Sequence, residues 1–185
     1  FKPVKTRKDA EKAAVKVRRK WNLGDSPILS VISTLENNGI NIIDFYAPEE
    51  FEGLSAYINK IPVIVLNNSV QEKTRRRFTT LHELGHLLLE IDDELDYKAI
   101  ERICDAFAAA MLLPRELLIM EIGNKRSKIS KNELKLLKEK YGISVHALLV
   151  GAAFSEIIDW DEYHNMRDQY IVDLGDYQGE EKPTK

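Results

Sequence analysis

The segment from Phe78 to Leu89 places two histidines, at positions 82 and 86, one helical turn apart, with a glutamate at position 83. Each residue turns a helix by about 100°, so the two imidazoles and the carboxylate project from one side of it. Apolar residues at helical spacing occupy the opposite side: Phe78, Leu81, Leu84, Gly85 and Leu88. The pattern therefore requires a helix anchored in a core, with one chemically active face.

Two histidines at this spacing can bind one zinc ion, and the glutamate beside them can take a proton from a water molecule that the ion activates. We therefore expect His82 and His86 to be metal ligands and Glu83 to be a general base. Zinc is the expected metal, and another divalent transition metal is the alternative. Accidental placement of two core histidines and a surface glutamate is the competing reading, so the surrounding sequence must discriminate.

A zinc site built on two histidines needs a third protein ligand and one open position. The helix expected from about Tyr97 to Leu113 carries Glu101 and Asp105 one turn apart, beside its apolar stripe. We expect Glu101 to complete the site and Asp105 to hydrogen-bond a ligand imidazole. Asp92 is the competing ligand, although the longer zincin pattern requires a histidine at this position and a glycine where Leu89 stands.

Composition limits the class of protein. The chain has 185 residues, 44% hydrophobic and 31% charged, as expected for a soluble globular protein. Its net charge of −3 gives no general attraction to nucleic acid or anionic membranes. The longest apolar run, Ala106 to Leu113, is too short to span a bilayer, and the single cysteine, Cys104, excludes an internal disulfide framework. We expect a cytoplasmic protein that binds neither DNA nor a membrane.

The periodicity predicts an α+β fold with a mostly helical C-terminal half. The expected elements are a helical hairpin (7–38), a small antiparallel sheet (40–66) with a turn at Asn59 and Lys60, the metal-site helices (70–113) and C-terminal helices (115–158). One domain is expected to cover 1–177, with a disordered tail at 178–185.

Two local features refine this expectation. The residues from Ser69 to Glu72 have the spacing of a capping box, which predicts a helix that begins near Val70. The run from Arg75 to Arg77 is expected to be a solvated basic collar, with a break in the helix near Arg77 as one option.

The stretch from Lys131 to Phe154 is similar to a helix-turn-helix, with a turn at Tyr141 and Gly142 and a cap at Ser144. Its second helix, Val145 to Phe154, is nearly all apolar and has no arginine, asparagine or glutamine to read base edges. Core packing is therefore the favoured interpretation of this unit, over DNA recognition.

Two linked stretches carry a family resemblance. Arg77–His86 reads R-F-T-T-L-H-E-L-G-H, and Glu101–Pro114 reads E-R-I-C-D-A-F-A-A-A-M-L-L-P. Together they resemble the ImmA/IrrE family of bacterial and phage metallopeptidases, which typically shows R-F-T-x-x-H-E-x-G-H and E-x-E-A-(N/D)-x-F-A-x-x-L-L-x-P. The resemblance covers roughly Ile28 to Phe154. The chain departs from the pattern at Ile103 and Cys104, where the family has glutamate and alanine.

The resemblance implies a zincin-like fold and a zinc-dependent endopeptidase. It also implies a protein substrate, a cognate helix-turn-helix transcriptional repressor, which the protein would cleave as an antirepressor on a mobile element or in a stress response. The strand around Ser55 to Ile58 is expected to pair with an extended segment of that substrate.

The group that stabilises the oxyanion stays open among four candidates: His146, His164, Tyr57 and Tyr97. The alternative function is a non-catalytic metal-binding sensor, or a partner-binding module that regulates a repressor by direct contact. Ile103 and Cys104 are the sequence features that favour this alternative.

Overall fold

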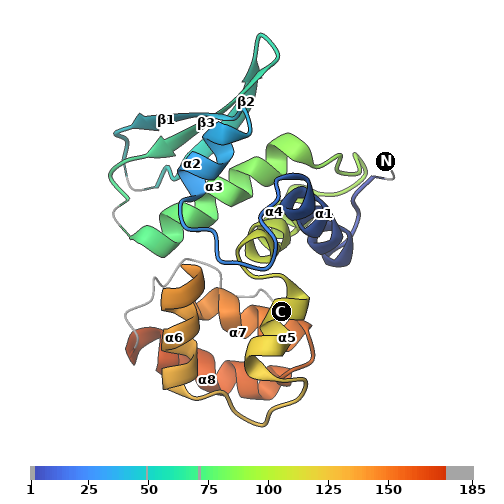
Figure 1. The fold of residues 1–185 in the computed structure, drawn as a ribbon, viewed down its shortest axis with the longest axis vertical. Coiled ribbons are helices and arrows are strands. Elements are labelled where there is room, and N and C mark those ends of the chain that lie inside the picture. Colours follow the sequence, from blue (N-terminus) through green and yellow to red (C-terminus); the bar gives the residue numbers. More distant parts are fainter. Residues whose placement is uncertain (1–2, 49, 71, 174–185) are drawn as a thin grey trace.

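The computed structural model describes residues 3–48, 50–70 and 72–173. A small sheet lies at one end of the molecule, the helices of residues 115–173 form the other end, and the long helices of residues 73–112 lie between them (Figure 1). The helices are α1 (Arg7–Lys20), α2 (Val31–Asn37), α3 (Lys73–Leu88), α4 (Tyr97–Leu112), α5 (Arg115–Ile122), α6 (Lys131–Tyr141), α7 (Val145–Phe154) and α8 (Trp160–Asp173). The strands are β1 (Asn41–Phe45), β2 (Gly53–Ile58) and β3 (Ile61–Asn67).

The fold is thus mixed α+β and mostly helical, as predicted. The expected end of the C-terminal helices at residue 158 was wrong, because α8 follows α7. Asp159 caps the first turn of α8, with its Oδ1 accepting from the Glu162 amide at 2.8 Å. Tyr163, Met166 and Tyr170 follow helical spacing and are buried. The expected tail, 178–185, lies outside the described residues.

The sheet has the order β1-β3-β2, and the prediction of an antiparallel sheet was only half right. Strands β2 and β3 form an antiparallel hairpin whose turn residues, Asn59 and Lys60, both have positive φ. Strand β1 pairs parallel with β3. Strand direction alternates along the chain, but β3, which contains the buried Ile64 and Leu66, takes the central position. Strand β1 therefore lies beside the strand that runs in its own direction.

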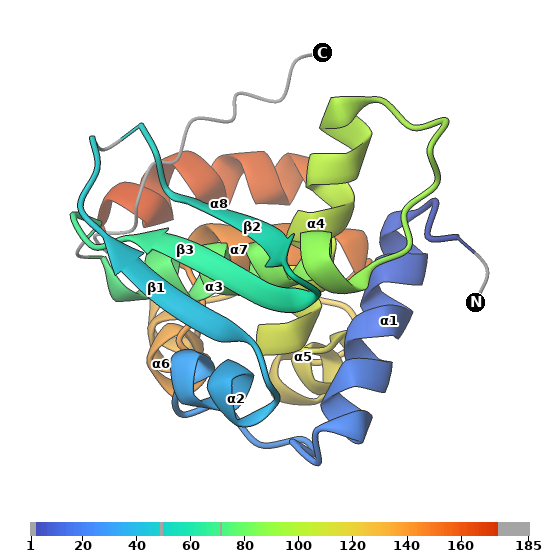
Figure 2. The same ribbon diagram turned by 90° about the horizontal axis from the view of Figure 1, so that it is seen from above.

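The two faces of the sheet have different environments. Ile64 and Leu66 point toward α3 and are almost fully buried. Alternate residues point the other way. On that outer face Ile43 and Leu54 flank Val65 and are 48% and 45% exposed. Figure 2 shows the outer face toward the viewer, with no helix of the described residues over it.

Helix α3 begins at Lys73, so the capping box predicted at Ser69 was wrong. The N-cap residue is Glu72, whose carboxylate accepts hydrogen bonds from the amides of Thr74 and Arg75. This carboxylate satisfies the free amides of the first turn, the role expected of the serine hydroxyl. The helix then continues to Leu88 without a break at Arg77. The predicted cap of α7 at Ser144 is present, and Ser130 and Glu133 form a capping box at the start of α6.

The run Arg75–Arg77 does not form a solvated collar, because each guanidinium has acceptors in the fold. Arg75 pairs with Glu52, and Arg76 pairs with Asp44. Arg77 donates to four backbone carbonyls, those of Ile28, Leu29, Tyr141 and Gly142, at 2.6 to 3.3 Å. It therefore joins α3 to the C-terminal end of α6, where a positive charge also complements the helix dipole.

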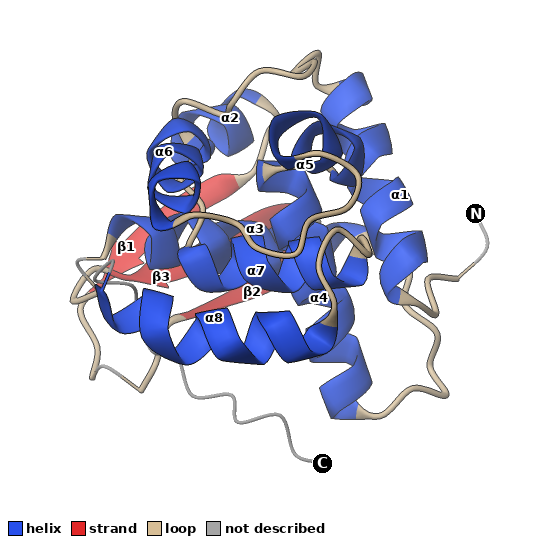
Figure 3. Ribbon diagram, turned by 90° about the horizontal axis from the view of Figure 1, so that it is seen from below, coloured by secondary structure: helices blue, strands red, loops and turns tan. Residues whose placement is uncertain are grey.

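The pair of helices α6 and α7 forms part of the core. Gly142 adopts the left-handed conformation between them, and the α7 residues Val145, Leu148 and Leu149 are almost fully buried. Helix α7 contacts α5, α6 and α8, which surround it in Figure 3. The predicted core role of this apolar helix is confirmed.

Among the described residues, no helix combines the length and the apolar character that crossing a membrane requires.

Arg77 provides a test of this packing. Arg77→Ala should lower the free energy of unfolding by about 2–4 kcal/mol, because several backbone carbonyls lose a charged donor. Urea denaturation of the purified protein measures the change. Arg19→Ala, on the exposed side of α1, is the matched control and should stay within about 0.5 kcal/mol of wild type. Equal stability of the two variants would contradict the proposed role of Arg77.

Candidate metal centre

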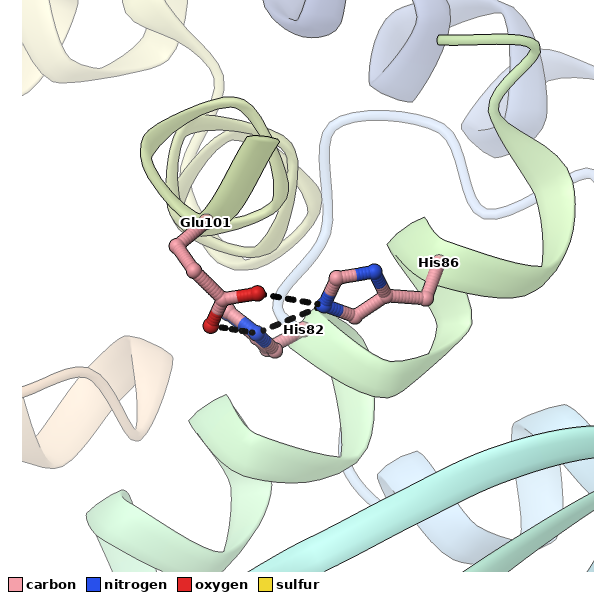
Figure 4. A group of neighbouring side chains, drawn as sticks. All are labelled: His82, His86 and Glu101. Atoms are coloured by element: carbon pink, nitrogen blue, oxygen red, sulfur yellow. Dashed lines mark hydrogen bonds and ion pairs between the residues drawn. The ribbon is translucent and has the colours of Figure 1, made fainter. Parts of the chain in front are cut away.

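Three side chains from two helices converge on one point. His82 and His86 project from α3, and Glu101 projects from α4 (Figure 4). The two histidine Nε2 atoms are 3.1 Å apart. The Glu101 carboxylate lies 3.3 Å from His82 Nε2 through Oε2 and 3.2 Å from His86 Nε2 through Oε1. The structure therefore brings together the three residues that the sequence predicts as ligands.

These separations suit a tetrahedral zinc ion. Zinc forms bonds of about 2.0–2.2 Å to imidazole nitrogen and carboxylate oxygen, which places neighbouring ligand atoms about 3.3 Å apart. Two imidazoles and one carboxylate also leave a fourth position for water or substrate. The donor set and the spacing both fit a zinc site of the catalytic type.

Asp105 contacts the imidazole of His82. Its Oδ1 lies 2.7 Å from Nδ1 of His82, so Nδ1 donates to this carboxylate and Nε2 faces the cluster. Burial opposes a charge on His82, but the hydrogen bonds with Asp105 and Glu101 outweigh it and raise the pKa of His82 to about 10. The hydrogen bond with His82 also lowers the pKa of Glu101. The site therefore favours positive charge, which either a proton or a metal cation can supply.

Glu83 lies next to this cluster without joining it. Its side chain is only 9% exposed, and its Oε2 accepts a hydrogen bond of 2.7 Å from the Ser55 hydroxyl of β2. The carboxylate therefore lies at the edge of the sheet, between helix α3 and strand β2. Sequence reasoning identified Glu83 but missed its partner. The available signal was a serine on the inward-facing side of an otherwise apolar strand.

The competing ligand, Asp92, does not join the cluster. Its carboxylate forms a 2.7 Å salt bridge with Lys5, and its amide donates to the Val4 carbonyl. Val4 in turn donates to the Glu90 carbonyl at 2.7 Å. The loop after α3 is therefore paired with the segment before α1, which keeps Asp92 away from the histidines.

One oxyanion candidate lies beside the cluster. Tyr97 lies one turn before Glu101 on α4, where the negative charge of Glu101 raises the pKa of its hydroxyl, and the residue is 73% exposed. Tyr57 donates its hydroxyl to the Leu87 carbonyl, at the end of α3. His146 lies 3.2 Å from the Tyr163 hydroxyl, and His164 stacks edge-on against the same ring. These two histidines belong to the α7–α8 region.

The two departures from the family pattern are both core residues. Ile103 is 3% exposed, and Cys104 is fully buried. Burial, followed by the nearby carboxylates, raises the pKa of the Cys104 thiol to about 12. A thiol in this state is unreactive at neutral pH. Neither residue contributes a side chain to the metal cluster.

Two histidines and a glutamate as metal ligands, with a further glutamate directly after the first histidine, is an arrangement found in zinc metallopeptidases. Residues 35–152 match the IrrE N-terminal-like domain family, peptidase M78, and the chain belongs to that family. Over 75 residues the chain is 39% identical to the radiation response metalloprotease IrrE of Deinococcus deserti. That match covers 34% of this chain and 26% of the relative, so the chain corresponds to about a quarter of its length.

A solved structure shares the fold. A transcriptional regulator of Mycobacterium tuberculosis superposes with a TM-score of 0.53 at 17% sequence identity. The superposition covers 78% of this chain and 47% of that one, so the relative has further structure of its own.

The ligand assignment predicts zinc content. The purified protein should bind about one zinc per chain, and Glu101→Ala should lose most of it, because only the two histidines remain. Asp92→Ala is the control and should keep full occupancy, since Asp92 pairs with Lys5. Metal analysis after dialysis decides the assignment. Full zinc in Glu101→Ala together with loss in Asp92→Ala would reverse it.

Proposed function

We propose that this chain is a zinc-dependent endopeptidase with a zincin-like domain, to which all the described elements belong. The observation that supports this most strongly is the convergence of His82, His86 and Glu101, beside the buried Glu83, in a chain of the peptidase M78 family. Zinc is the proposed cofactor, since the donor set is two imidazoles and a carboxylate.

Each residue has a distinct role in the proposed reaction. His82, His86 and Glu101 would hold the ion, and Asp105 keeps His82 in the tautomer that presents Nε2. Bound zinc would supply a Lewis acid that activates water and polarises the scissile carbonyl. Glu83 takes a proton from the attacking water and later returns it to the leaving amine. Of the four oxyanion candidates we favour Tyr97, because it lies on α4 one turn before the ligand Glu101 and its side chain is exposed.

Strand β2 is the proposed docking edge for the substrate. It is an outer strand of the sheet, and its Ser55 contacts Glu83. An extended peptide that pairs with β2 would therefore run past the general base and the metal ligands. Main-chain pairing of this kind accepts many sequences, so we expect selectivity to come from further contacts outside this strand.

The proposed substrate is a cognate helix-turn-helix transcriptional repressor, whose cleavage would switch on the genes that it represses. Membership of a peptidase family supports cleavage of a protein substrate, and the Deinococcus relative, named a radiation response metalloprotease, is consistent with a role in a stress response. The protein would act in the cytoplasm, where its repressor acts. Direct DNA contact is not part of the proposal, because α7 is buried in the core.

Glu83→Gln separates catalysis from binding. The variant should keep its fold and its zinc, while the rate of repressor cleavage falls by about 10²- to 10⁴-fold, because an amide cannot accept the proton of water. Co-expression of each protein with the repressor encoded beside it, followed by immunoblotting under inducing conditions, measures cleavage. If the repressor disappears equally with wild type and variant, the peptidase proposal fails. A repressor that is inactivated but stays intact would favour the non-catalytic module.

Tyr57→Pro tests docking on β2. Proline removes the backbone amide at this position, so pairing with the substrate weakens and KM should rise by about tenfold. Tyr57→Ala is the matched control, because it removes the same side chain, including its contact with Leu87, but keeps the amide. Equal KM values for the two variants would show that the substrate does not pair with this strand.

A further inference from the structure

We propose that Ser55 is a positioning residue for Glu83, and that it couples docking of the substrate strand to the orientation of the general base. The inference rests on the proposed peptidase function and assigns a role to a residue outside both motifs of the family pattern.

The contact between Ser55 and Glu83 is short and shielded from solvent. The Ser55 hydroxyl donates to Oε2 of Glu83 at 2.7 Å, a short hydrogen bond to an acceptor that is an anion when the base is active. The Glu83 side chain is 9% exposed, so few water molecules can replace this donor. With Oε2 held by Ser55, Oε1 is the oxygen left to receive the proton of water. A fixed carboxylate of this kind avoids the cost of orienting the base in each turnover.

The hydrogen-bond register of β2 determines where the main chain of Ser55 points. The main-chain amide of Asn67 donates to the Glu52 carbonyl at 2.9 Å, so the main-chain groups of position 52 face β3. Inward and outward main-chain groups alternate along an antiparallel strand, so Leu54, Ala56 and Ile58 also face β3. Pro62, which has no amide hydrogen, lies opposite Tyr57 and fits this register. The amide and carbonyl of Ser55 therefore point to the open edge of the sheet.

Ser55 connects the open edge of the sheet to the general base. The main chain of Ser55 faces the edge where a substrate strand would pair, and its side chain holds the general base. Pairing of a peptide with β2 would restrict this strand, and through the hydroxyl it would restrict the Glu83 carboxylate. The residue therefore contributes to substrate binding through its backbone and to the chemical step through its side chain.

Three variants separate these contributions. Ser55→Ala removes the hydroxyl and keeps the backbone, so kcat should fall by about 10- to 100-fold while KM stays close to wild type. Ser55→Thr keeps a hydroxyl on a residue that suits a strand, and most of kcat should return. Ser127→Ala, which removes an exposed serine hydroxyl between α5 and α6, away from the docking strand, is the control and should leave kcat unchanged. Kinetics on purified repressor, with zinc content and melting temperature of each variant, provide the readouts.

The outcomes distinguish this inference from the peptidase proposal. If wild type cleaves the repressor and Glu83→Gln does not, the peptidase proposal stands. Under that condition, wild-type kcat in Ser55→Ala would overturn the role of Ser55. So would an equal loss of kcat in Ser55→Ala and Ser55→Thr with zinc and stability intact. Absence of any cleavage by wild type under inducing conditions would instead refute the peptidase function itself.

Discussion

The metal cluster depends on the close approach of helices α3 and α4. At their contact, Gly85 faces α4, and a Cβ at this position would lie 3.4 Å from the Cα of Cys104 and 3.3 Å from the Phe107 ring. A larger residue at either position would separate the helices. Because Gly85 directly precedes His86 and Cys104 follows Glu101 by three residues, such a separation would also pull the carboxylate away from the imidazoles. Small residues at this contact, rather than the ligands alone, therefore set the geometry of the site.

The charges around this cluster favour a bound cation. Two imidazole nitrogens and a carboxylate meet within 3.3 Å of one another, and Asp105 adds a further negative charge behind His82. Such a group is stable only when a proton or a metal cation supplies positive charge. Glu83 lies outside the cluster and accepts a hydrogen bond from Ser55. Glu101 can therefore serve as a ligand while Glu83 remains available as a base, although the two residues lie on neighbouring helices, α4 and α3.

Sequence reasoning reached the site because its information is local. His82, Glu83 and His86 occupy one helix, and Glu101 and Asp105 share another, so spacing alone indicated which faces would meet. The errors arose where distant residues decide the outcome. Strand β1 is parallel because β3 takes the centre of the sheet, Arg77 binds carbonyls from residues far along the chain, and Ser55 meets Glu83 only once the sheet packs on α3. The missed helix α8 has a different explanation. Its apolar spacing and its Asp159 cap are local features that the sequence already contains.

The most direct test of the central claim is a crystal structure of the zinc-loaded protein with anomalous data collected at the zinc edge. The account predicts one strong anomalous peak per chain, bonded to Nε2 of His82, Nε2 of His86 and a carboxylate oxygen of Glu101, at distances of about 2.0–2.2 Å. Glu83 should lie outside that coordination sphere, with Ser55 still within hydrogen-bonding distance. A peak elsewhere in the chain, or one that Glu83 or Asp92 coordinates in place of Glu101, would contradict the account.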